Sequence, residues 1–201
     1  ADDNAVENLL NQYPVKTLGE LISIVRPMPI SQTDGTELVL EVAPADFPEF
    51  GYVNKPGREI KLTLQNAERN RRSYLKPFDI ILTIKGSVGK VAIIPNDVPN
   101  EKWVMGQSCI VLRQDAKSHS IDPRILFSFL KSEIGQLQIK GIVTGAAVPV
   151  IQIRELEKLK IPVPESVDSQ SIVSKFEKIA DIEESVLQSR QLQEQIAKSI
   201  W

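Results

Sequence analysis

Two short apolar runs joined by a turn between glycines constrain the fold of this chain more than any other feature. The runs cover residues 79–84 and 88–94 and consist almost entirely of apolar and β-branched residues. Runs of this length and composition predict strands that are buried on both faces. The connecting segment 85–90, KGSVGK, has the glycines of a tight turn. We therefore predict a β-hairpin in the middle of a β-rich core.

The turn carries Lys85, Ser87 and Lys90 around its two glycines. A small basic turn with free backbone N–H groups suits the phosphates of a nucleic acid. A hairpin turn with solvated lysines explains the same residues. The segment is not a nucleotide-binding P-loop, because that motif needs four residues between its glycines and a helix after its lysine, whereas here a strand follows.

Six motifs follow one another in a fixed order along the chain. They are PFDIIL leading into GSVGK at 77–90, GQSCIVLR at 106–113, DP before LFSFL at 122–130, GAAVPVI at 145–151, LEKLKIPVP at 156–164 and QSIV at 170–173. In order and spacing they resemble the target recognition domain in specificity (S) subunits of type I DNA restriction-modification systems. The resemblance extends from about Val15 to the C-terminus.

The resemblance implies an α+β fold: a mixed, β-rich target recognition domain with flanking short helices, followed by one long helix for coiled-coil pairing. We expect an N-terminal helix or linker at 1–14, the recognition domain at 15–164 and the long helix at 165–201. The implied function is sequence-specific recognition of double-stranded DNA without catalysis, directing an adenine-N6 methyltransferase subunit, and in some systems a restriction subunit, to its site. The chain could be a half-subunit, a fragment of a two-domain subunit, or the C-terminal domain of a fused methyltransferase.

The charge distribution agrees with a DNA-binding face, although the net charge of −2 alone argues against one. Residues 55–102 carry ten Lys and Arg against five Asp and Glu, whereas residues 1–54 carry two against nine. The side chains of the densest cluster, RNRR, can bind phosphate and read base edges, although a solvated surface turn explains them equally well. The candidate DNA contacts are Arg69, Asn70, Arg71, Arg72, Lys85, Ser87, Lys90, Lys140 and Thr144.

Three aromatic residues lie close together in a chain that is only 5% aromatic. Phe47, Phe50 and Tyr52 could stack on bases, or they could form a small apolar cluster under a loop.

From residue 169 to 201 the sequence has no Pro or Gly, which predicts one helix about 50 Å long. Such a helix is too long to pack along one small domain, so we expect it to pair with another helix, either in a homodimer or from another subunit. The predicted pairing face has approximately heptad spacing, which Gln193 interrupts. Its residues are Ile172, Phe176, Ile179, Val186, Ile196 and Ile200.

Other functional classes have weaker support. Cys109 lies in an apolar run and the only histidine, His119, lies in a polar loop, so we expect a buried thiol and a reducing cytoplasm. We also expect no metal, no cofactor and no membrane segment. An adenine-N6 methyltransferase needs an Asp/Asn-Pro-Pro-aromatic tetrapeptide for the target base and a Gly-rich loop for S-adenosylmethionine. Neither motif is present in the sequence. Asp46 with Glu59 and Lys61 faintly resembles a magnesium nuclease site. A helical scaffold protein without DNA affinity is the remaining alternative.

Overall fold

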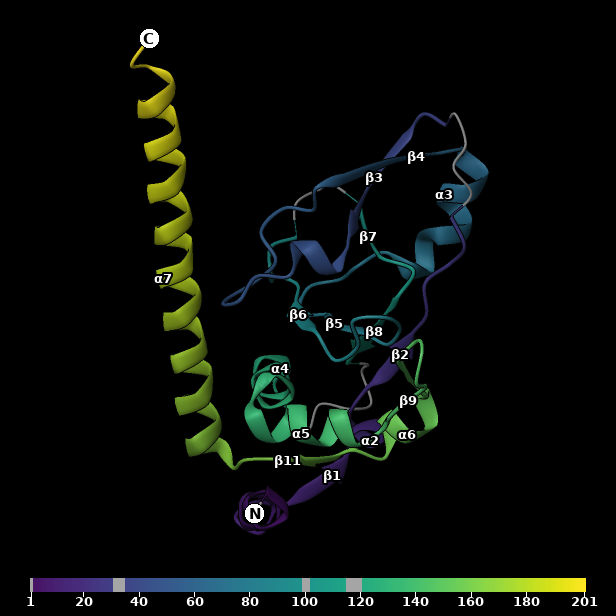
Figure 1. Ribbon diagram of the computed structural model, residues 1–201, viewed down its shortest axis with the longest axis vertical. Helices are drawn as coiled ribbons and strands as arrows, with labels where there is room; N and C mark the ends of the chain where they lie inside the picture. The colour runs from purple at the N-terminus through teal and green to yellow at the C-terminus, as the bar shows by residue number, and fades with distance from the viewer. Residues whose placement is uncertain (1, 31–34, 99–101, 115–120) are drawn as a thin grey trace.

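Two β-sheets and a layer of short helices lie beside one long helix, which confirms the α+β class (Figure 1). The computed structural model describes residues 2–30, 35–98, 102–114 and 121–201. Within these ranges, no helix combines the length and the apolar character needed to cross a lipid bilayer.

The predicted hairpin forms one half of a four-stranded antiparallel sheet, and its second strand is at the edge of that sheet. The strands run in the order β2 (Ser23–Val25), β8 (Cys109–Arg113), β5 (Ile80–Thr83) and β6 (Val91–Ile93). Ile81 of β5 lies opposite Ala92 on one side and Val111 on the other. Every residue of β5 and β6 is buried, as predicted.

Alternate residues of β5 belong to two different cores. Ile80 and Leu82 face the helical layer, whereas Ile81 packs with Trp103 and Met105 of a second sheet. Because both faces of the strand are covered, its sequence is apolar throughout rather than alternating with polar residues. The four-stranded sheet is thus the middle layer of the domain.

The second sheet has three strands and carries the basic cluster at its edge. Its order is β4 (Arg58–Leu62), β3 (Glu37–Val42) and β7 (Lys102–Met105), with β3 antiparallel to β4 and parallel to β7. After β4 come α3 (Leu64–Asn70) and the 3₁₀ turn η2 (Arg71–Ser73), while η1 (Pro44–Asp46) follows β3.

The helical layer covers the other face of the middle sheet. It contains α4 (Pro123–Lys131), α5 (Glu133–Gly141), α2 (Leu18–Leu21) and α6 (Ile153–Glu157), preceded by α1 (Asp2–Leu10). Asp122 caps α4 by accepting a hydrogen bond from the Arg124 N–H at 2.9 Å, with Pro123 in the first turn, as predicted. Two short antiparallel ladders complete the layer: β1 (Val15–Thr17) with β11 (Lys160–Pro162), and β9 (Val143–Thr144) with β10 (Val150–Ile151).

The long helix α7 (Ser166–Lys198) has 33 residues and lies within the predicted range 165–201. It runs along one side of the domain, and its C-terminal half stands clear of the short helices (Figure 1).

A buried ion pair connects two of the sequence motifs. Arg113 at the end of β8 donates from Nε to Oδ1 of Asp79 at 2.9 Å and from Nη2 to Oδ2 at 2.7 Å. The Asp79 side chain is 1% exposed, and its Oδ2 also accepts the Lys76 N–H at 2.7 Å. Arg113 donates once more, to the Tyr74 carbonyl at 3.0 Å. The carboxylate is therefore fully satisfied although it is buried.

The turn before β5 is strained at one residue. The Asp79 N–H donates to the Lys76 carbonyl at 3.1 Å, closing a four-residue turn with Pro77 at its second position. Its third residue, Phe78, has φ of +62°, a conformation that glycine adopts more readily. The Phe78 ring lies 5.1 Å from the Arg124 guanidinium and 6.3 Å from the Tyr52 ring, contacts that a glycine would lose.

Replacing Arg113 with Met is expected to lower the free energy of unfolding by about 3–5 kcal/mol, because the Asp79 carboxylate remains buried without its partner. Chemical denaturation followed by circular dichroism measures the change.

Lys158→Met is the matched control. It breaks an exposed pair with Glu155 at 2.9 Å and is expected to change stability by less than about 1 kcal/mol. Equal effects of the two substitutions would contradict a structural role for the buried pair.

Candidate nucleic-acid interface

The hairpin turn is held from inside by its own backbone. Gly86 and Gly89 have φ of +73° and +87°, which glycine adopts without a Cβ penalty. The Gly89 N–H donates to the Thr83 carbonyl at 2.9 Å and the Lys90 N–H to Thr83 Oγ1 at 2.9 Å, while Thr83 Oγ1 donates to the Ser87 carbonyl at 2.7 Å. The prediction of free N–H groups is thus wrong for Gly89 and Lys90. Lys85, Ser87 and Lys90 expose their side chains.

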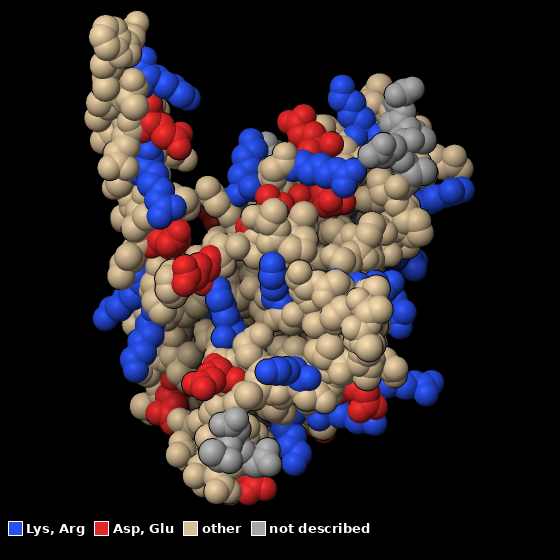
Figure 2. Space-filling model, viewed as in Figure 1, with Lys and Arg blue, Asp and Glu red and all other residues tan. Residues whose placement is uncertain are grey.

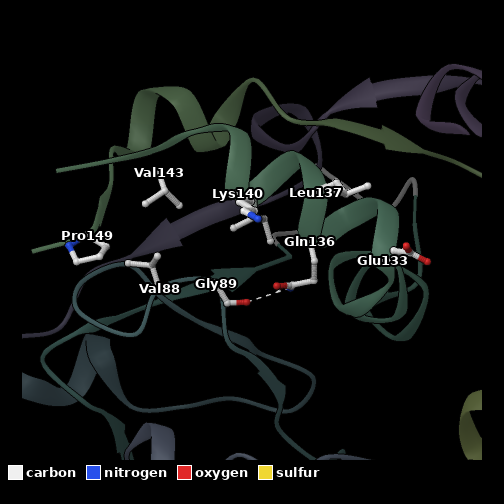
Figure 3. Close-up of a pocket in the computed structure, with 9 residues that line it drawn as sticks. Val88, Gly89, Glu133, Gln136, Leu137, Lys140, Val143 and Pro149 are labelled. Carbon is white, nitrogen blue, oxygen red and sulfur yellow. Dashed lines mark hydrogen bonds between the residues drawn. The ribbon is translucent and has the colours of Figure 1, made fainter. Parts of the chain in front are cut away.

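Segments from the helical layer brace the same turn. The Gly86 N–H donates to the Pro149 carbonyl at 3.0 Å, and Gln136 Nε2 of α5 donates to the Gly89 carbonyl at 3.0 Å (Figure 3). A pocket of about 460 Å³ lies between the turn and α5, with Val88, Val143 and Pro149 among its lining residues.

Five of the nine candidate DNA contacts therefore occupy one region. Lys140, in the last turn of α5, lines the pocket beside the turn, and Thr144 lies in β9, paired with Val150. Lys85 forms a bridge with Val150 of the neighbouring strand. All five candidates are exposed: Lys85, Ser87, Lys90, Lys140 and Thr144.

The other four candidates lie at the end of α3, on the three-stranded sheet. Arg69, Arg71 and Arg72 are exposed. Arg71 Nη2 lies 3.1 Å from Glu68 Oε1, and both side chains are largely solvated, so this pair binds the guanidinium only weakly. Three positive charges at a helix C-terminus are also favourable for the helix itself.

Asn70 requires a correction, because it is 2% exposed. Its Nδ2 donates to the Asn66 carbonyl at 2.8 Å, and its own carbonyl accepts the Ser73 hydroxyl at 2.8 Å. Its side chain thus closes the end of α3 and does not point to the surface. The sequence could not distinguish this internal hydrogen bond from an exposed amide.

The two basic regions lie on different sheets. In Figure 1, α3 and β9 are both on the side of the domain away from α7, at different heights. Figure 2 shows the lysines and arginines of one face interspersed with acidic side chains rather than in one uniform patch.

Asp46 of the possible nuclease site has a structural role. Asp46 Oδ2 accepts the Ala43 N–H at 2.8 Å and Oδ1 accepts the Gly57 N–H at 3.1 Å. Over the described part of the chain, no three Asp, Glu, His or Cys side chains come together as they would around a metal ion. His119 lies outside the described residues. Cys109 is buried, and burial raises the pKa of its thiol to about 11.

A joint of aromatic and charged residues attaches α7 to the domain. Phe176 is 5% exposed and packs edge-to-face on Tyr52 and Phe127, at centroid distances of 5.1 and 5.7 Å. The Tyr52 hydroxyl donates to Glu177 Oε1 at 2.6 Å, and Arg124 Nη1 lies 2.8 Å from the same oxygen. Burial and the Glu177 carboxylate raise the pKa of Tyr52.

The structure corrects one prediction for the helix and favours the apolar cluster over base stacking for two of the three aromatics. Ile172 and Phe176, expected on the pairing face of the helix, pack on the chain's own domain. Ile179, Ile196 and Ile200 are exposed, and Val186 is half-buried. Of the three aromatics considered for base stacking, Phe47 and Tyr52 pack against the cores and Phe50 is half exposed. Tyr52 is therefore part of the helix joint, a role that the sequence analysis missed.

The arrangement defines a class: a layered α+β domain with exposed basic residues at a braced turn and a helix end, and one long projecting helix. A sequence model described as the type I restriction modification DNA specificity domain matches residues 15–196. The chain belongs to this family. A comparison with curated proteins gives no match.

Solved structures have the same fold at low sequence identity. The S subunit of a type I restriction-modification system from M. genitalium matches with a TM-score of 0.60 and 18% identity over 92% of this chain and 43% of that one. The HsdS subunit from Thermoanaerobacter tengcongensis matches with a TM-score of 0.56 and 16% identity over 94% of this chain and 45% of that one. The type IIG restriction endonuclease BpuSI matches with a TM-score of 0.61 and 9% identity over 89% of this chain and 28% of that one. The chain thus spans less than half the length of each of these proteins.

Replacing Phe176 with Ala is expected to lower the free energy of unfolding by about 3–5 kcal/mol, because a buried ring between two others is removed. Thermal and urea denaturation measure the change. Val167→Ala, on the same helix but 78% exposed, is the control and should stay within about 0.5 kcal/mol. If both variants were as stable as the wild type, Phe176 would not anchor the helix.

Proposed function

We propose that this chain recognises a specific sequence in double-stranded DNA and has no catalytic activity of its own. The observation that carries the proposal is the match of the DNA specificity domain family to residues 15–196. The exposed cations at the hairpin turn and at the end of α3 supply the charge that such a function needs. Because the chain spans less than half of the solved relatives, it provides one recognition domain, which reads one half of a bipartite site.

The partners follow from the same family membership. The recognition domain directs an adenine-N6 methyltransferase subunit to its site, with a restriction subunit in a complete system. Two copies of the chain pair through the exposed part of α7, whose isoleucines have no cover from the domain. The complex works in the cytoplasm, where the DNA is. The division at 15–164 and 165–201 places the reading function in the layered domain and the pairing function in the helix.

The two basic regions have different roles in this proposal. Arg69, Arg71 and Arg72 contact base edges and adjacent phosphates, because guanidinium groups can bind either one through two hydrogen bonds. Lys85, Ser87 and Lys90 contact phosphates, because lysine acts as a point charge and the turn is rigid. Lys140 and Thr144 extend this phosphate contact along α5 and β9. Asn70 is left out because it is buried.

The triple substitution Arg69→Gln, Arg71→Gln, Arg72→Gln is expected to weaken binding to a selected DNA duplex at least 100-fold and to relax its sequence preference, because each lost base contact costs about 1–3 kcal/mol. Fluorescence anisotropy on the duplex selected by the wild-type chain from a randomised pool measures both.

The charge-matched control is Lys175→Gln, Lys178→Gln, Lys198→Gln on α7, which removes three exposed cations far from α3. If the two triple variants weakened DNA binding equally, the arginines would contribute to binding only through their net charge. A wild-type chain that binds no DNA, while its mass remains that of a dimer, would instead support the scaffold alternative.

The double substitution Lys85→Gln, Lys90→Gln should weaken binding to every duplex by a similar factor and leave the preferred sequence unchanged. Two lost phosphate contacts lower the slope of log K against log salt by about 1.8. Titrations at several salt concentrations measure the slope. A changed sequence preference would show that the turn reads bases.

A further inference from the structure

One large apolar side chain of the layered domain is left in water beside the basic cluster. Among the large apolar side chains that the structure describes between residues 15 and 164, Leu64 is the most exposed, at 69%. Single leucines on a protein surface are ordinary, so exposure alone assigns no role. The position of Leu64 is more informative, because it is the first residue of α3, the helix that ends in the three arginines.

The fold uses the neighbours of Leu64 rather than Leu64 itself. Thr63 caps α3, because its hydroxyl oxygen accepts a hydrogen bond from the Asn66 N–H at 3.2 Å. Leu62 and Ala67 attach the helix to the three-stranded sheet, since they are 0% and 7% exposed and belong to the core cluster of that sheet. The cap and the packing of α3 therefore do not depend on an apolar residue at position 64.

The outer face of α3 combines three kinds of side chain. Residues three and four apart share a helix face, so Leu64 and Glu68 lie on one side, and the chain continues on this side to Arg71 and Arg72. All four are exposed, and Arg71 Nη2 lies 3.1 Å from Glu68 Oε1. In Figure 1, α3 lies at the outer side of the domain, away from α7. An apolar, an acidic and a basic group are thus presented together on an open surface.

This combination fits the major groove of DNA better than the phosphate backbone. Phosphates attract the arginines, but they repel Glu68 and have no favourable contact for a leucine. Base edges in the major groove offer a partner for each group: guanine accepts from arginine, the cytosine amino group donates to glutamate, and the 5-methyl group of thymine contacts apolar side chains. The groove is about 12 Å wide and admits an α-helix.

We propose that α3 enters the major groove and that Leu64 reads the 5-methyl group of a thymine. The inference rests on the DNA recognition proposed above, and it adds a specificity-determining residue, the chemical group that this residue contacts and the groove in which the contact lies. The contact removes the methyl group and the leucine side chain from water together. A cytosine at the same position offers no methyl group and places a polar amino group near the leucine.

The length of α3 limits the distance between this thymine and a guanine read by the arginines. Leu64 and Arg72 are separated by about 12 Å along a helix. Because successive base pairs rise by about 3.4 Å, this distance spans about four base pairs. A thymine at one such position is therefore expected in each half-site that the chain selects.

Removal of single methyl groups from the DNA tests the contact without altering the protein. Deoxyuridine replaces thymidine, one position at a time, in the duplex that the wild-type chain selects, and fluorescence anisotropy measures each affinity. Replacement at one thymine near the guanines of a half-site should weaken binding about fourfold, which is the effect expected for one buried methyl group.

The variant Leu64→Ala identifies the protein side of the contact. It should bind the thymidine duplex at least about fourfold more weakly than the wild type and should no longer distinguish thymidine from deoxyuridine at that position. Its melting temperature should equal that of the wild type, because Leu64 is exposed. Val148→Ala is the matched control. Val148 is 62% exposed, and it precedes Pro149, which braces the other basic region, so this variant should keep the wild-type discrimination.

The outcomes separate this contact from DNA recognition itself. Loss of methyl discrimination in Leu64→Ala alone supports the proposal. Three results overturn the contact and leave the proposed function intact: a wild-type chain that binds its selected duplex without discriminating at any thymine, discrimination that persists in Leu64→Ala, and equal loss in both variants. A wild-type chain that selects no duplex overturns both.

Discussion

Burial of the Asp79 carboxylate against Arg113 is the interaction on which the layered domain depends. The two residues are 34 positions apart, and their pair joins the start of β5 to the end of β8 across the middle sheet. A carboxylate that is 1% exposed is stable only when its oxygens are all bonded, and here Arg113 and the Lys76 N–H supply those bonds. The same bonds hold the strained turn at Phe78, whose ring lies over Arg124. Through Arg124 the constraint reaches Glu177 and the long helix.

The position of α7 relative to the reading surfaces follows from this chain of contacts. Arg124 is held by Asp122 on one side and Glu177 on the other, and these partners raise its pKa so that it stays charged. Burial alone would raise the pKa of Asp122, but its hydrogen bonds with Arg124 outweigh this effect and lower it. Arg124 and Asp122 thus stay ionised over the physiological pH range. In the proposed dimer, these contacts would set the orientation of each recognition domain relative to its helix.

The sequence predicted the parts of the fold that depend on local pattern. The central hairpin follows from two apolar runs and two glycines, the start of α4 from Asp122 and Pro123, and α7 from an uninterrupted stretch without Pro or Gly. Local patterns do not predict which residues far apart in the sequence contact each other. A lone aspartate before a buried strand indicates that Asp79 needs a partner, but nothing local identifies Arg113 as that partner.

The errors at the candidate site have the same origin. Asn70 and Phe176 have the residue types of a base contact and a coiled-coil position, and both are used internally. Helical periodicity gives the apolar residues of α7 but does not say whether a partner helix or the chain's own domain covers each one. The backbone N–H groups of the turn were expected to be free, whereas the hydroxyl and carbonyl of Thr83 take up two of them.

Selection of DNA from a randomised duplex pool by the wild-type chain tests whether the chain recognises a specific sequence. We expect enrichment of a bipartite sequence, with two inverted half-sites at one fixed spacing, because the proposed symmetric dimer holds two identical domains. Enrichment of a single half-site would support sequence-specific DNA recognition but contradict the proposed pairing of two copies. A pool that is unchanged after repeated rounds at moderate salt would contradict sequence-specific DNA recognition itself.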